Sequence, residues 1–140
     1  MTQINPYIAF KGNCEEAFNF YKSVFGGEFT YISRFGEMPE SDGYTVPEAE
    51  KAMIMHVSLP IGTTTLMGSD TPVAYRNNSI VGNNISVSFN TNSEKEAHDV
   101  FNGLAEGGNV LTPLAKTFWA PLFGMLTDKF GINWMINWEG

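Results

Sequence analysis

His56 is the side chain of this sequence best suited to chemistry near neutral pH, because an imidazole titrates there and can both donate and accept. It lies in the apolar run "MIMHVSLP", which has the composition of a β-strand. Alternation along a strand groups His56 with Ile54 and Ser58 on one face. If that face lines a cleft, His56 is a candidate general base or hydrogen-bond anchor. The alternative is a structural histidine bonded to neighbouring backbone or to a carboxylate.

The segment "GINWMINW" near the carboxyl end is predicted to be a strand with two unlike faces. One face is strongly apolar and contains Trp134 and Ile136. The other consists of Asn133, Met135 and Asn137, two amides that flank a thioether. Amides form hydrogen bonds without carrying charge, and methionine fills irregular apolar space. This face therefore suits the wall of a neutral, partly apolar cleft better than it suits water.

Several other side chains are candidates for ligand contact. Phe118 and Trp119 stand in "KTFWAPLFG", where loop aromatics suit a pocket wall, a plug at the end of a barrel or a contact with a partner subunit. The hydroxyls of Tyr7 and Tyr31 could reach a cleft, the alternative being core tyrosines with one bonded hydroxyl. Met67 is a methionine that could lie outside the plain core. Cys14 falls in the first turn of a predicted helix, where we expect packing in preference to reactivity.

Composition narrows the classes of protein to consider. The 140 residues suit a single domain, and a net charge of −7 with scattered basic residues argues against nucleic-acid partners. One cysteine cannot form an internal disulfide, which favours the cytoplasm. The amino terminus shows no signal peptide, and no apolar run is long enough to cross a membrane.

The sequence repeats one pattern twice. Each copy begins with a short strand, residues 6–10 and 85–89, and continues into a predicted amphipathic helix. Asn13 with Glu16, and Ser93 with Glu96, have the spacing of a helix capping box. Both helices are predicted to end at a glycine pair. Their apolar stripes correspond in order: Ala17, Phe20, Tyr21 and Val24 in the first copy, and Ala97, Val100, Phe101 and Leu104 in the second.

Three β-like segments follow each helix, so each copy is predicted to be a βαβββ module. We expect an α+β fold within residues 1–140, with module one at 1–70, a flexible connector at 71–82 and module two at 83–140. One helix covers only one face of a four-stranded sheet. The two sheets are therefore expected to curl around a cleft.

The duplicated βαβββ pattern resembles the vicinal oxygen chelate superfamily, which includes glyoxalase, bleomycin-resistance and dioxygenase proteins. The phrases "NPYIAFKGNCEEAFNFYKSVFGGE", "FGEMP", "TLMGSD" and "TFWAPLFGMLTDKFGINWMIN" are similar to its PhnB-like branch, also called 3-demethylubiquinone-methyltransferase-like. The resemblance extends over almost the whole chain. It implies the glyoxalase/bleomycin-resistance-like fold and a homodimer, with or without exchanged elements.

Metal enzymes of this superfamily bind their metal through His, Gln or Glu side chains on equivalent strands of both modules. Carried over to this sequence, those positions fall near Pro6 or Tyr7, at Asn84 and at Met135. A thioether is a poor ligand for hard or borderline divalent cations. The resemblance therefore implies no metal ligand set and no cofactor here.

Two functional classes follow from the resemblance. The first is a small-molecule-binding protein without the usual metal site. Its candidate ligand contacts are Tyr7, Met67, Phe118, Trp119, Asn133 and Met135, and His56 is the candidate catalytic residue. The alternative is a divalent-metal-dependent, glyoxalase- or lyase-like enzyme acting on a small polar substrate. A methyltransferase is a weaker alternative, because no glycine-rich loop for S-adenosylmethionine is visible.

Overall fold

The computed structural model describes residues 2–39 and 45–140. The chain divides into two compact units between Ile80 and Val81, within the predicted connector, and each unit is described by itself. The connector contains a short 3-10 helix, η3 (Val73–Asn78), where we had expected no regular structure. No helix of the described residues is long and apolar enough to span a membrane.

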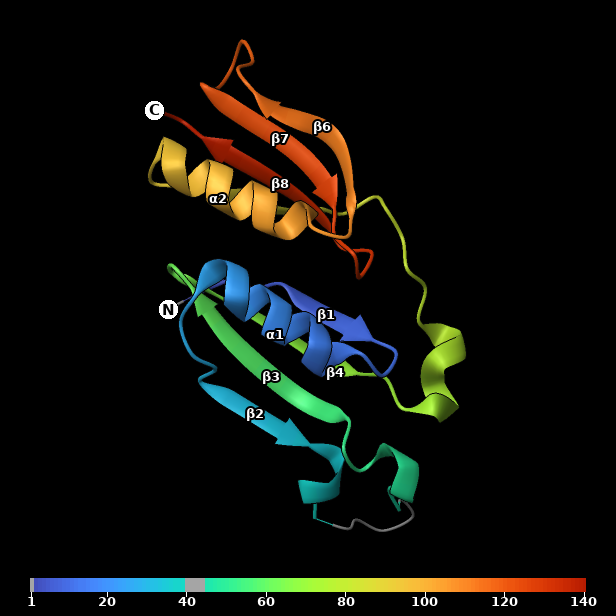
Figure 1. Cartoon of the computed structure of the whole chain (residues 1–140). Helices are drawn as coiled ribbons and strands as arrows, with labels where there is room; N and C mark the ends of the chain where they lie inside the picture. The colour runs from blue at the N-terminus through green and yellow to red at the C-terminus, as the bar shows by residue number, and fades with distance from the viewer. Residues whose placement is uncertain (1, 40–44) are drawn as a thin grey trace. The chain divides into compact units, whose positions relative to one another are not determined.

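The N-terminal unit confirms the predicted βαβββ order (Figure 1). Its sheet has the strand order β1-β4-β3-β2, in which β1 runs parallel to β4 and the other neighbours are antiparallel. Short 3-10 helices, η1 (Phe35–Glu37) and η2 (Glu48–Glu50), lie between β2 and β3. The main elements are β1 (Tyr7–Phe10), α1 (Cys14–Phe25), β2 (Tyr31–Arg34), β3 (Ile54–Ile61) and β4 (Thr64–Asp70).

The C-terminal unit repeats this topology with the strand order β5-β8-β7-β6. Again the first strand is parallel to the last, and the remaining pairs are antiparallel. The two units thus confirm the predicted duplication. The elements of this unit are β5 (Val87–Asn90), α2 (Glu94–Ala105), β6 (Asn109–Ala115), β7 (Leu122–Thr127) and β8 (Asn133–Trp138).

Helix α1 packs on one face of the N-terminal sheet, over β3 and β4. Its buried side chains are Cys14, Ala17, Phe18 and Tyr21. The predicted stripe was wrong in one respect, because Phe20 and Val24 are only half buried while Phe18 is fully buried. The reason lies in β4. Gly68 leaves room for the Phe18 ring, so close that a β-carbon at Gly68 would lie 2.6 Å from Phe18 Cε1.

Helix α2 packs on the C-terminal sheet with Ala97, Val100, Phe101 and Leu104 buried, as predicted. Its cap is also close to the prediction. The Ser93 hydroxyl accepts from the Glu96 N–H at 3.0 Å, and the Glu96 carboxylate accepts from the Asn92 N–H at 2.8 Å. In α1, by contrast, the Asn13 side chain makes no capping hydrogen bond. There the carboxylate of Asp70 takes its place.

Asp70, at the end of β4, is a buried carboxylate that joins three elements of the N-terminal unit. Its Oδ1 accepts from the backbone N–H groups of Gly12 and Cys14, both at 2.9 Å. Its Oδ2 accepts from the Ile54 N–H, also at 2.9 Å. Because Cys14 is the first residue of α1, Asp70 satisfies donors that a helix start would otherwise leave unpaired.

Candidate functional site

The face of the N-terminal sheet that turns away from α1 is the strongest candidate site. Gly68 contacts Phe18, so its strand neighbours Met67 and Ser69 point to the opposite side. Met67 pairs with Tyr7 on β1 and with Ser58 on β3, and Ser58 pairs with Tyr31 on β2. These side chains form a continuous row across all four strands. We call this side of the sheet the N-terminal open face.

His56 lies on the N-terminal open face, two residues from Ser58. Its Nε2 is 2.9 Å from the Ser58 hydroxyl oxygen. The imidazole is flanked by two aromatic rings, with centroid distances of 5.7 Å to Tyr7 and 5.6 Å to Tyr31. Both tyrosines are about half exposed, at 50% and 51%. The predicted candidates Tyr7, His56 and Met67 therefore lie on one surface.

The predicted grouping of His56 with Ile54 is wrong. His56 pairs with Ser33 and Ile54 pairs with Arg34, so β3 has one more residue than β2 at this point. Such a β-bulge breaks the strict alternation of faces. Ile54 is completely buried and its N–H is bound by Asp70, whereas His56 is only partly buried.

Asn133 and Met135 lie on the corresponding open face of the C-terminal sheet. A β-carbon at Gly124 would lie 2.6 Å from the Phe101 ring, which places Gly124 and its partner Ile136 on the α2 side. Trp134 is also buried, at 1% exposed. Met135 therefore points away from α2, in a row with Ser88, Met125 and Thr112. The two unlike faces predicted for this strand are confirmed.

The amides of this second face are partly engaged. Asn133 is 8% exposed, and its Oδ1 accepts from the Thr127 hydroxyl at 2.7 Å. Asn137 donates from Nδ2 to the Asn90 side-chain oxygen at 3.2 Å. The Nδ2 group of Asn133 also donates to the Ile85 carbonyl oxygen at 3.4 Å, so Asn137 keeps more donor capacity for a neutral ligand than Asn133 does.

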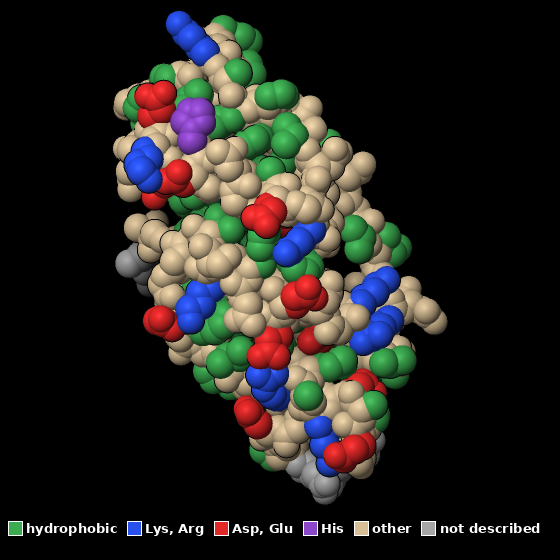
Figure 2. All heavy atoms as spheres, viewed as in Figure 1, with side chains coloured by type: hydrophobic (Ala, Val, Ile, Leu, Met, Phe, Trp, Pro, Cys, Tyr) green, Lys and Arg blue, Asp and Glu red, His purple; other side chains and the backbone are tan. Residues whose placement is uncertain are grey.

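Both open faces are uncharged. Among the strand residues of the described chain, only Arg34 and Asp70 carry charge, and both turn toward α1. The Arg34 guanidinium forms a two-point ion pair with Glu15, on α1, at 2.6 and 2.9 Å. The face of the molecule seen in Figure 2 shows acidic and basic side chains interspersed with apolar ones. Among the described residues, the strand side chains of the two open faces thus carry no charge.

The donor set of the open faces does not fit the superfamily's metal sites. It offers one imidazole, together with thioethers, amides and hydroxyls, but no carboxylate or thiolate. Within residues 2–39 and 45–140 no three His, Cys, Asp or Glu side chains are grouped so as to hold a metal ion. Zinc, iron and manganese sites rely on those side chains.

Phe118 and Trp119 lie in the loop between β6 and β7. The Trp119 ring packs edge-on against Phe123 of β7, with centroids 5.3 Å apart, and Phe118 packs against Trp119 at 4.7 Å. Phe123 pairs with Asn137, so it belongs to the C-terminal open face. Trp119 therefore covers the end of that face, while Phe118 projects outward and is 97% exposed.

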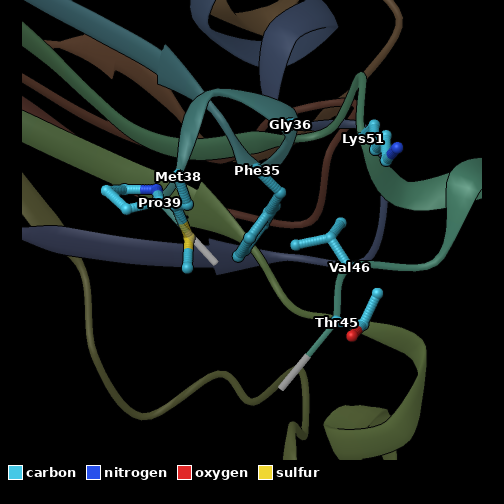
Figure 3. Close-up of a pocket in the computed structure, with 7 residues that line it drawn as sticks. All are labelled: Phe35, Gly36, Met38, Pro39, Thr45, Val46 and Lys51. Atoms are coloured by element: carbon cyan, nitrogen blue, oxygen red, sulfur yellow. The ribbon is translucent and has the colours of Figure 1, made fainter. Parts of the chain in front are cut away.

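A small pocket beside β2 is a weaker candidate. Its volume is about 100 Å³, and Figure 3 shows the side chains of Phe35, Met38 and Val46 around it. Drug-sized ligands occupy roughly 300–1,000 Å³. The pocket is therefore smaller than a typical site for a drug-sized ligand. Among the described residues that line it, Lys51 carries the one titratable side chain.

Cys14 is buried completely at the start of α1. Burial raises the pKa of the Cys14 thiol far above its usual value, and the carboxylates of Asp70 and Glu15 raise it further. A thiol in this state is a poor nucleophile. The structural role expected for Cys14 is supported.

Residues missed from sequence are the ones that depend on strand pairing. Ser33 stands opposite His56 only because of the register between β2 and β3. Tyr31 was named from the sequence as a possible cleft residue, but its place beside the imidazole depends on the same register. Alternation within one strand carries no information about its neighbour, so no local signal could have grouped these side chains.

Two βαβββ units with uncharged open faces define the class of protein. The fold matches a glyoxalase/bleomycin resistance protein/dioxygenase family enzyme from Burkholderia phytofirmans with a TM-score of 0.62. That match covers 96% of this chain and 97% of the other at 14% identity, and it shows the fold alone.

Within that superfamily fold, the chain belongs to the family described as 3-demethylubiquinone-9 3-methyltransferase, whose model matches residues 2–137. Protein YjdN of Escherichia coli K12 is 32% identical over 140 residues, covering 96% of this chain and 93% of YjdN.

Two solved structures extend this relationship. Protein PA1353 from Pseudomonas aeruginosa is 46% identical with a TM-score of 0.86, covering 99% of this chain and 98% of that one. A PhnB protein from Bacillus cereus is 28% identical with a TM-score of 0.77, covering 98% and 99%. The chain is therefore a PhnB-like protein.

Proposed function

We propose that this protein binds an uncharged small molecule on the N-terminal open face, without the superfamily's usual metal site. The observation that supports this proposal is the His56–Ser58 pair, held between two half-exposed tyrosines on a face without charged side chains. His56 is the polar anchor of the site. Tyr7, Tyr31 and Met67 supply aromatic and apolar contact.

The chemistry of the face favours a neutral ligand. A charged group placed on it would lose water without gaining an opposite charge. The imidazole and the neighbouring hydroxyls can instead form hydrogen bonds with a carbonyl, ether or hydroxyl group. If a reaction occurs, His56 is the group that could move a proton, because it carries the one imidazole among the described side chains of this face.

The second neutral surface belongs to the same proposal. Asn133 and Met135 on the C-terminal open face, with Phe118 and Trp119 at its end, are proposed as further ligand contacts. Their support is the same pairing of amides with thioether and aromatic groups, again without charge. Trp119 is 58% exposed, which leaves much of its ring available.

The two histidines of the chain provide the test. An NMR spectrum of the imidazole groups contains one signal from His56 and one from His98, which is exposed on α2. We expect uncharged fragments that bind at millimolar concentration to shift the His56 signal and leave His98 in place. They should also raise the melting temperature, because a ligand that binds the native state stabilises it.

Matched variants make this test specific. His56→Gln should reduce the binding of such fragments about tenfold, the value of one lost hydrogen bond with its packing. His98→Gln is the control and should bind as the wild type does. Fragments that shift His98 as much as His56, or that bind His56→Gln normally, would contradict the proposal.

Two further measurements cover the alternatives. Stoichiometric zinc, nickel, manganese or iron in the purified protein would reject a metal-free binding site and favour a metal-dependent lyase-like enzyme. Methyl transfer, which the family description names, requires a site for S-adenosylmethionine. Tight binding of S-adenosylmethionine would favour that activity instead.

A homodimer in the cytoplasm completes the proposal. The exposed apolar side chains of Ile80, Ile85 and Phe118, at 88%, 79% and 97% exposed, support association with a second copy. Sedimentation equilibrium tests this directly, and a monomer at micromolar concentration would contradict it.

A further inference from the structure

Ser33 on β2 is buried, at 6% exposed, and its hydroxyl has no hydrogen-bond partner within the described residues. Two other serines show the usual situation: Ser58 is bonded to His56 and Ser23 donates to the Phe20 carbonyl. Buried polar groups are almost always paired in native proteins, because an unpaired one loses its bonds to water. The exception at Ser33 requires an explanation.

The position of Ser33 in the sheet explains why its hydroxyl is left without a partner among the described residues. It is the strand partner of His56, and partnered side chains lie on the same face with β-carbons about 5 Å apart. Tyr31 is two residues away on the same strand, so its side chain points to this face as well. The unpaired hydroxyl therefore lies within the proposed site, beside its imidazole.

One ring nitrogen of His56 is also available for a hydrogen bond to a ligand. Its Nε2 faces the Ser58 hydroxyl, whereas its Nδ1 has no hydrogen-bond partner in the part of the chain that is described. A ligand atom near both Ser33 and His56 would thus meet a hydroxyl donor and a ring nitrogen. Sites that hold a polar group ready in this way sacrifice some stability for recognition.

We propose that Ser33 is a specificity-determining residue whose hydroxyl donates a hydrogen bond to an acceptor oxygen of the ligand. This inference rests on the proposed function and adds to it the chemical class of the ligand. The ligand is an uncharged molecule with an aromatic or apolar body and a carbonyl or ether oxygen. Molecules of the same shape without that oxygen bind more weakly.

Acetophenone and α-methylstyrene form a suitable pair of probes, because they have nearly the same shape and only the first has an acceptor oxygen. Dissociation constants are measured from the His56 imidazole signal. We expect the wild type to prefer acetophenone about tenfold, the effect of one buried hydrogen bond. Ser33→Ala should bring this preference close to one.

Ser69→Ala is the matched control, because Ser69 is a half-buried serine on the same face that does not pair with Ser33. It should keep the preference of the wild type. An unchanged preference in Ser33→Ala, with binding still at His56, overturns the role of Ser33 and leaves the proposed function intact. If neither probe shifts His56 in the wild type, both proposals fail for this class of ligand.

A second readout needs no ligand. Removing an unpaired buried hydroxyl should leave the melting temperature of the free protein unchanged or raise it, whereas removing a bonded hydroxyl should lower it. We therefore expect Ser33→Ala to melt no lower than the wild type. A clear fall in its melting temperature would show that the hydroxyl already has a partner, and would overturn the proposal.

Discussion

The two modules share a topology but secure the start of their helices differently. In the N-terminal module Asp70, 56 residues from Cys14 along the chain, binds the first turn of α1. In the C-terminal module Ser93 caps α2 from the adjacent position. A cap from a distant strand fixes the helix, β3 and β4 relative to one another, whereas a local cap stabilises only the helix.

The C-terminal module has a buried aspartate of its own, but it acts locally. Asp128 accepts from the N–H groups of Phe130 and Ile132 and from the Trp134 indole at 2.8, 3.1 and 2.9 Å. These partners all lie within six residues of it. The comparison shows that one buried aspartate joins segments far apart in the chain, whereas these three hydrogen bonds of the other close a turn.

The open faces differ as much as the caps do. The N-terminal face carries an imidazole, two phenols and serine hydroxyls, whereas the C-terminal face carries amides and thioethers. The imidazole of His56 therefore distinguishes the N-terminal face from the C-terminal face. Four predictions follow that test the comparison of the modules.

The largest effect is expected for Asp70→Ala. It leaves the buried N–H groups of Cys14 and Ile54 unpaired, and should lower the free energy of unfolding by about 3–5 kcal/mol. Asp128→Ala should cost less, about 2–3 kcal/mol, because two of its donors lie in a part-buried turn that water can reach. Urea unfolding monitored by circular dichroism measures both. Equal losses would contradict the contrast.

The glycines beneath the two helices should tolerate alanine poorly. At Gly68 a β-carbon would lie 2.6 Å from the Phe18 ring and 2.8 Å from the Ile8 carbonyl oxygen; at Gly124 it would lie 2.6 Å from the Phe101 ring. Each change to alanine should cost about 1–3 kcal/mol by overpacking. Thermal unfolding measures this, and the exposed Gly82→Ala is the control. A neutral Gly68→Ala would show that α1 can move outward freely.

Removing the side chains at the cap positions of the two helices should produce a smaller difference in stability. Ser93→Ala should destabilise the protein by about 1 kcal/mol, because it removes the acceptor for the Glu96 N–H. Asn13→Ala should change stability by less than about 0.5 kcal/mol, since the Asn13 side chain caps nothing. Chemical denaturation of the two variants in parallel compares them. The reverse order would mean that Asn13, not Asp70, holds α1.

The smallest effect concerns pH. Hydrogen bonding from Arg34 holds the pKa of the Glu15 carboxyl below its usual value of 4.5, against a smaller opposing effect of burial. The pair therefore stabilises the fold above that usual value, and this contribution is lost as pH falls through the lowered pKa.

Exposure limits the size of this contribution. The side chains are 47% and 35% exposed, so the contribution is a few tenths of a kcal/mol and weakens with salt. Glu15→Gln should be less stable than wild type at pH 6, and the difference should shrink toward zero as the pH falls through the lowered pKa of Glu15, while Glu16→Gln should track the wild type throughout. Melting temperatures across this range provide the measurement, and a difference that persists in acid would contradict the assignment.

Some of the candidate site could be foreseen and some could not. The open-face position of Met135 and the buried position of Trp134 follow from alternation within one strand, and both are confirmed. The stripe of α2 follows in the same way from helical periodicity. In α1 the prediction misplaced Phe20, because the phase of that helix is set by the space above Gly68 on a distant strand.

The sequence alone determined the duplicated βαβββ order and the two faces of β8, because these depend on periodicities within single elements. Only the tertiary structure decided that Asp70 caps α1, that a bulge separates Ile54 from the row of His56, and that Ser33 stands beside the imidazole. Each of these depends on strand pairing between residues far apart in the chain. Such pairing is fixed by the packing of the whole module.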